Sequence, residues 1–175
     1  MPEPVSQDVA TRDSFQCVPP GPMHPFAYHA SFSPAQYARI QRGLIPEEME
    51  DKWFIFWEDD TLYLHRSWTG HCVYVVHFQR VPLGYEVSKA FVSATRLQDR
   101  GAADYEPRLL DFLIRGLLLH EPLPFPDPPW IGRWGRRHWQ YLVVGNLSTP
   151  PPGENAALLT RTWRTLGRWF PGPSH

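Results

Sequence analysis

Three runs rich in aromatic and β-branched residues follow one another in the middle of the chain. They cover residues 52–58, 61–67 and 71–79. The first link between them is a pair of aspartates, and the second is a short turn that ends in Gly70. Links of this length join neighbouring antiparallel strands. The pattern therefore predicts a three-stranded antiparallel meander.

Side chains of successive strand residues point to opposite faces, so the pairing of the strands assigns each residue to a face. We pair Glu58 with Thr61 and Ser67 with His71. One face is then almost wholly apolar, which predicts a cover of helices. The other face mixes aromatic residues with histidines and is predicted to be partly solvated or to form the wall of a cleft. The apolar face holds Trp53, Ile55, Trp57, Leu62, Leu64, Cys72, Tyr74, Val76 and Phe78, and the mixed face holds Phe54, Phe56, Tyr63, His65, Val73, Val75 and His77.

Apolar residues at helical spacing predict helices on either side of the meander. Ser33 is a favourable N-cap, Pro34 suits the first helical position, and Gly43 suits the end of this first helix. A second helix begins at Asp104 or Glu106 and runs to about His120. The remaining elements predicted are strands over residues 86–94 and 140–144 and an amphipathic helix over residues 154–170.

These elements predict an α+β fold: an antiparallel meander sheet of about four to five strands, with two or three helices packed mainly on one face. A chain of 175 residues is long enough for one such core. Residues 1–24 combine prolines and charges without apolar periodicity, which predicts a disordered or loosely attached tail. Residues 25–175 are predicted to form the single globular domain.

The composition argues against several classes of partner. The net charge of −1 gives no overall field that would draw the protein to nucleic acid or to a membrane surface. Residues 130–139 interleave arginine with tryptophan, as single-strand nucleic-acid grooves do, but the alternative is a loop anchored to the core by its tryptophans. Nucleic acid is therefore not an expected partner. No apolar run reaches the roughly 18 residues of a membrane span.

Only Cys17 and Cys72 are present, which is too few for a disulfide framework and fits a reduced, cytoplasmic location. The first sixteen residues lack the apolar core of a secretory signal. Structural zinc sites show Cys and His pairs at short regular spacing, and no second pair occurs here. No metal site is predicted, and the cofactor, if any, stays open.

Residues 32–78 contain the segments Ile45–Phe54 and His65–Gly70, which read IPEEMEDKWF and HRSWTG. Both segments resemble a group of small bacterial proteins, and the resemblance extends over residues 32–120. It implies a single fold and an intracellular bacterial origin. It transfers no mechanism.

The hairpin tip around Arg66 is the most chemically dense part of the chain. Arginine can grip a phosphate or carboxylate with two parallel hydrogen bonds, and tryptophan offers a stacking surface. This mixture predicts a site for a small anionic or nucleotide-like ligand. The alternative is a tight turn in which Arg66 pairs with Glu50 or Asp51. The predicted ligand-binding residues are Tyr63, His65, Arg66, Ser67, Trp68, Thr69 and His71.

Three functions remain open on this basis. The first is a small binding or regulatory module whose ligand meets the mixed face and the hairpin. The second is an enzyme acting on a phosphate-bearing or nucleotide-derived substrate, for which His65, Glu50 and Asp51 are the catalytic candidates. The third is a protein-interaction subunit of the immunity or antitoxin type that uses an exposed tryptophan. Whether the protein is an enzyme is not decided by the sequence.

Overall fold

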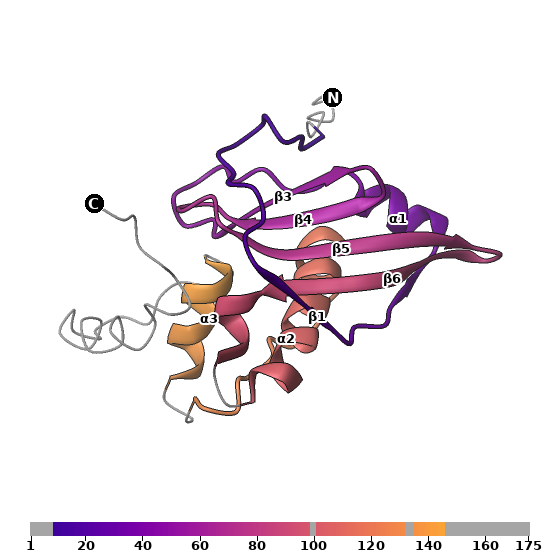
Figure 1. Cartoon of the computed structure of the whole chain (residues 1–175). Coiled ribbons are helices and arrows are strands. Elements are labelled where there is room, and N and C mark those ends of the chain that lie inside the picture. The colour runs from indigo at the N-terminus through magenta and orange to yellow at the C-terminus, as the bar shows by residue number, and fades with distance from the viewer. Residues whose placement is uncertain (1–8, 99–100, 132–134, 146–175) are drawn as a thin grey trace.

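The computed structural model describes residues 9–98, 101–131 and 135–145, and they form an α+β fold (Figure 1). Its antiparallel sheet has six strands in the order β1-β6-β5-β4-β3, and β2 pairs with β6. The strands are β1 (Met23–Phe26), β2 (Ser31–Phe32), β3 (Trp53–Glu58), β4 (Thr61–Arg66), β5 (Cys72–Val81) and β6 (Gly84–Ser93). The helical elements are α1 (Pro34–Ile40), the 3₁₀ turn η1 (Ala94–Gln98), α2 (Ala102–Asp111), the π-helix η2 (Phe112–Leu118) and α3 (Arg136–Val144).

The predicted meander is present as β3, β4 and β5. Glu58 is paired with Thr61 as expected, and both aspartates of the connecting turn have positive φ angles, as a two-residue hairpin turn requires. A bulge between Leu64 and His65 then shifts the register, so that His65 lies opposite Cys72. This shift reverses two predicted assignments. Cys72, predicted for the apolar face, lies opposite His65 on the mixed side, and Val73, predicted for the mixed face, packs in the main core.

Helices cover one face of the sheet, as predicted. Side chains of α1, α2, η2 and α3 join the apolar residues of β3 to β6 in the main hydrophobic core. Figure 1 shows α2 and α3 gathered on one side of the strands. Trp53 is fully buried there, whereas Trp57 is only partly buried against Tyr37 and Phe78. Ser33 caps α1 and forms the reciprocal capping box with Gln36.

Two predicted elements differ from the structure. Residues 140–144 belong to the helix α3 and not to a strand, because Trp139 and Val143, four residues apart, both turn into the core. The second helix begins at Ala102, slightly earlier than expected, and continues into η2. The predicted helix over residues 154–170 lies outside the described residues.

On the opposite face of the sheet, the N-terminal segment covers part of β3 and β4, and it crosses the strands before it enters β1 (Figure 1). Ala10 is 1% exposed, and its N–H donates to the carbonyl of Arg42 over 2.8 Å. With Phe54 and Phe56 it forms a second hydrophobic cluster. The expectation of a loosely attached tail is therefore wrong for residues 9–24, and the mixed face is not open along β3. We call the cluster of Ala10, Phe54 and Phe56, with Phe15, Cys17, Ile45 and Tyr63 packed on it, the outer cluster.

Candidate functional site

The guanidinium of Arg66 is buried and holds the end of α3. Its side chain donates to the carbonyl oxygens of Val143 over 2.8 Å and Leu142 over 3.0 Å, and it lies 4.9 Å from the Trp53 ring centroid. These carbonyls end a helix and have no partner within it, so a buried donor stabilises them. Burial and the nearby charge of Arg96 lower the pKa of Arg66 to about 9, and the group remains cationic at neutral pH. The sequence did not predict this partner.

His65 points away from Arg66, into the outer cluster. It is 1% exposed, donates from Nδ1 to the carbonyl of Gly70 over 2.8 Å and stacks on Phe56. Among the described residues, Nε2 has no hydrogen-bond partner. Burial lowers the pKa of His65, and the hydrogen bond to Gly70 opposes that shift only in part. His65 is therefore a neutral side chain that shapes the hairpin.

The other predicted ligand-binding residues also hold the hairpin together. Ser67 donates to the carbonyl of Asp51, Thr69 accepts from the N–H of His71, and the His71 ring lies 3.2 Å from the Ser93 hydroxyl. Tyr63 stacks on Phe56 in the outer cluster. The structure thus divides the hairpin residues between both faces and the turn, and it does not bring them to one point.

Trp68 is the exposed member of the hairpin, with 58% of its surface accessible. Its Nε1–H donates to the carbonyl of Met49 over 2.6 Å. The ammonium of Lys52 sits 3.7 Å from its ring centroid and 5.4 Å from that of Tyr141. Trp68 therefore links the hairpin to the acidic loop through its hydrogen bond to Met49. It is linked to α3 through the ammonium of Lys52, which makes cation–π contacts with both Trp68 and Tyr141.

Of the predicted catalytic carboxylates, Asp51 lines a small pocket of about 320 Å³ together with Glu47, Lys52 and His120. Asp51 Oδ2 already accepts the N–H groups of Glu47 over 2.9 Å and Glu48 over 3.1 Å, so it serves the loop. Glu50 does not line the pocket, and His65 faces the outer cluster. The three catalytic candidates are not brought together.

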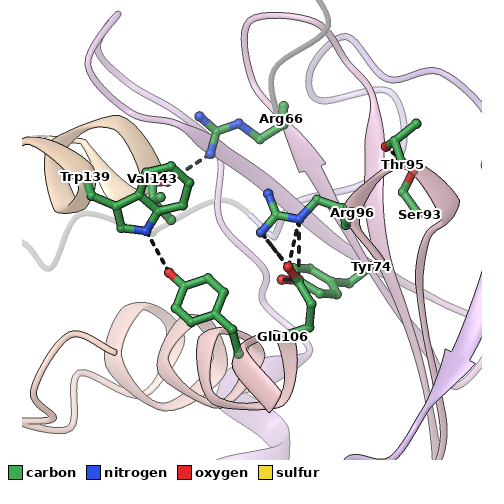
Figure 2. Close-up of polar contacts among 9 residues, drawn as sticks. Arg66, Tyr74, Ser93, Thr95, Arg96, Glu106, Trp139 and Val143 are labelled. Atoms are coloured by element: carbon green, nitrogen blue, oxygen red, sulfur yellow. Dashed lines mark hydrogen bonds and ion pairs between the residues drawn. The ribbon is translucent and has the colours of Figure 1, made fainter. Parts of the chain in front are cut away.

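A buried ion pair lies between the sheet and α2 (Figure 2). Arg96 donates from Nε and Nη2 to the carboxylate of Glu106, and Tyr74 donates its hydroxyl to the same carboxylate. Tyr74 is fully buried, and its pKa is raised well above its ordinary value by burial and by the charge of Glu106. Sequence reasoning missed this cluster because its members come from β5, η1 and α2.

The tryptophan-rich segment meets the core beside this cluster. Trp139 Nε1 donates to the hydroxyl of Tyr105 over 2.8 Å (Figure 2). Trp130 packs edge-on against the same tyrosine. Trp139 therefore anchors α3 to α2, which supports the anchoring alternative for this residue. Arg133 and Trp134 lie outside the described residues.

A second cavity is a groove of about 800 Å³ beside α2. Its walls are one face of α2, the connection between β1 and β2, and the proline-rich segment 123–127. We call it the α2 groove. Apolar surface comes from Phe112, Leu123 and Phe125. The rings of Phe112 and Phe125 meet edge-on, with their centroids 5.3 Å apart. The polar side chains in the lining are His29, Arg108, Asp111 and Asp127, with Tyr28 beside them.

Asp111 is held in a fixed orientation at the edge of this groove. Its Oδ1 accepts the Tyr28 hydroxyl over 2.9 Å and Arg115 Nε over 3.1 Å. Arg115 also forms a 3.5 Å ion pair with Glu121, which in turn accepts Gln36 Nε2 over 2.9 Å. Burial, followed by the charge of Asp111, raises the pKa of Tyr28, so its hydroxyl stays a donor. The Asp111 side chain remains 38% exposed.

Within the described part of the chain, no three His, Cys, Asp or Glu side chains converge as metal ligands would. Nor does any described helix combine the length and apolarity needed to cross a membrane. No protein-family model matches the chain, and no curated protein or solved structure matches it either.

Two histidines of the hairpin, the buried His65 and the partly buried His71, lead to a prediction about pH. The folded-state pKa values of His65 and His71 lie below the ordinary 6.5 because of burial, so the unfolded chain binds more protons near that pH. The contribution of these histidines to the free energy of unfolding is therefore expected to be fully present above the histidine pKa of the unfolded chain. It should fall as the pH drops through that pKa. Thermal unfolding between about pH 7.5 and about pH 5.5 measures this slope. His65→Gln should reduce the change of melting temperature with pH. An unchanged slope would mean that His65 does not contribute to this pH dependence.

Proposed function

We propose that this protein is a small cytoplasmic binding module, and that its ligand occupies the α2 groove. The observation that carries the proposal is the combination of a cavity of about 800 Å³, apolar walls and one oriented carboxylate. Ligand sites in proteins commonly have this size and this mixture of apolar walls and few fixed polar groups. The hairpin has weaker support, because Arg66 and His65 are engaged elsewhere.

The charges of the groove favour a cationic ligand over an anionic one. Asp111 and Asp127 line it, and Arg108 is the arginine in the same lining, with His29 beside it. Arg115 forms ion pairs with both Asp111 and Glu121, so its single positive charge does not neutralise these two carboxylates together. A protonated amine is the group that such a carboxylate recognises best, through a charge-assisted hydrogen bond.

The apolar walls define the rest of the ligand. Phe112 and Phe125 present ring surfaces to the groove, and Leu123 adds aliphatic surface. An aromatic or aliphatic body of modest size would replace water along these walls, which is favourable in proportion to the apolar area removed from water. The proposed ligand class is therefore a compact organic amine with an apolar body.

A matched series of small probes tests the ligand class. Phenethylamine, 2-phenylethanol and 3-phenylpropionate share one apolar body and differ in charge. At millimolar concentration we expect the amine to raise the melting temperature most, the alcohol less and the carboxylate least, since a ligand stabilises the state that binds it. Binding is followed in parallel by NMR chemical-shift changes.

Asp111→Asn is the test variant for this series, and Asp104→Asn on the same helix is its control, since Asp104 does not line the groove. The amine should lose its advantage over the alcohol in Asp111→Asn and keep it in Asp104→Asn. Equal shifts for all three probes, or an amine effect that survives in Asp111→Asn, would refute the proposed ligand class. A larger effect of the carboxylate would favour an anionic ligand for this groove.

A further inference from the structure

The only two cysteines of the sequence lie on the same side of the sheet, although they are far apart in the chain. Cys17 packs against the outer cluster. Cys72 lies opposite His65 across β4 and β5, and His65 stacks on Phe56 of that same cluster. The N-terminal segment thus carries one thiol to the strand that holds the other.

The backbone shows how close the two segments are. The N–H of Val18 donates to the carbonyl of Gly70 over 2.8 Å. A Cβ built on Gly70 would stand 3.3 Å from the Cα of Cys17, and Cys72 is only two residues further along. In addition, the Cys17 thiol contributes to the raised pKa of Cys72, although burial is the larger cause.

We propose that Cys17 and Cys72 are a redox pair that forms an intramolecular disulfide when the protein meets a disulfide oxidant such as oxidised glutathione. In this structure both are free thiols. Cys17 contacts the carbonyl of Arg12 at 3.5 Å, and Cys72 contacts that of Tyr74 at 3.6 Å. Neither thiol is committed to a strong partner, because sulfur is a weak donor.

The order of the two steps follows from exposure. Cys17 is partly exposed and Cys72 is buried, so the thiolate of Cys17 attacks oxidised glutathione and releases one glutathione thiolate. Cys72 then loses its proton to water and attacks the Cys17 sulfur, which releases the second glutathione as a thiolate. The two released thiolates take up the two protons that the protein thiols lose. Two protein thiols are oxidised, and one glutathione disulfide is reduced to two thiols.

The disulfide would fasten the N-terminal segment over Phe54 and Phe56. It would close a loop of about 55 residues and so restrict the unfolded chain, which stabilises the folded state. Neither cysteine lines the α2 groove. The inference is therefore independent of the proposed amine ligand.

The test uses the full-length protein in glutathione buffers of graded oxidised-to-reduced ratio, in native conditions and in urea. After free thiols are alkylated, intact mass and peptide mapping identify the disulfide. We expect a monomer about 2 Da lighter than the reduced protein, with a peptide joining Cys17 to Cys72. The equilibrium constant for forming this disulfide from oxidised glutathione should be at least about tenfold higher in the folded protein than in the unfolded chain. The oxidised monomer should also unfold at a higher urea concentration.

Cys17→Ser and Cys72→Ser are the matched variants, and each should abolish the internal disulfide. Three results would overturn the proposal. The first is a folded protein whose two thiols stay alkylatable in oxidising buffer. The second is an equilibrium constant no higher than that of the unfolded chain. The third is a glutathione adduct or a disulfide dimer on Cys17 as the main product of the wild-type protein.

Discussion

Replacing Glu106 with alanine is expected to lower the free energy of unfolding by about 3–5 kcal/mol, the usual cost of breaking a buried ion pair from one side. Arg96 and Glu106 are 3% and 0% exposed, and the carboxylate accepts hydrogen bonds from both Arg96 and Tyr74. Without it, the Arg96 guanidinium loses its carboxylate and the Tyr74 hydroxyl loses its acceptor inside the core. Urea unfolding followed by tryptophan fluorescence measures the loss.

Two comparisons isolate the role of the charge. Glu58→Ala removes one member of the exposed pair with Arg12, and it should cost far less because water solvates both groups. The double variant Arg96→Met, Glu106→Leu removes the buried pair together, and it should recover much of the stability lost by Glu106→Ala. If Glu106→Ala and Glu58→Ala cost the same, the buried pair is not the source of stability that we infer.

This buried pair marks a limit of sequence reasoning. Asp104 and Glu106 both look like acidic residues in the first turn of a helix, where they favour the helix dipole. The structure separates them, because Asp104 is exposed while Glu106 faces Arg96 and Tyr74. No local pattern distinguishes the two, since the partners lie 10 and 32 residues away.

Local periodicity predicted the central strands of the sheet, but it did not predict the bulge in β4 or the helical state of residues 140–144. The alternation in β3, β4 and β5 was clear enough to give the register up to the bulge at Leu64. The short apolar run 140–144 fits a strand as well as a buried helical face, and only its packing against α2 decides between them. The alternative in which Arg66 pairs with Glu50 or Asp51 fails for a similar reason, because Arg66 donates to backbone carbonyls of α3, which is distant in the sequence.

The candidate site was the feature that the sequence predicted least well. The HRSWTG segment concentrates chemically versatile side chains, but a tight hairpin uses such groups to satisfy its own backbone. The α2 groove, in contrast, is built from a helix, a strand connection and a proline-rich segment that are distant in the sequence. Its oriented Asp111 lies within the predicted second helix, but no local pattern distinguishes it from the other polar residues there.

Deleting residues 1–18 is expected to destabilise the protein by on the order of 2–4 kcal/mol, from exposure of phenylalanine surface that is now buried. The deletion removes Ala10, Phe15 and Cys17 from the outer cluster and uncovers Phe54 and Phe56. The signal for this cover was present in the sequence, because alternation placed two phenylalanines on the second face of the sheet. A loosely attached tail would have left both in water.

Deletion of residues 1–8 is the matched control, because it stops short of Ala10 and leaves the outer cluster whole. Urea unfolding of both truncated proteins, with binding of an apolar fluorescent dye as a second readout, separates loss of cover from a general effect of shortening the chain. The longer deletion should lower the midpoint and increase dye binding, whereas the shorter one should do neither. Equal behaviour of the two would mean that Phe54 and Phe56 gain nothing from the segment above them. Ordering residues 9–18 costs conformational entropy. The apolar contact with these two rings offsets it together with the hydrogen bonds that Ala10 and Val18 donate to Arg42 and Gly70.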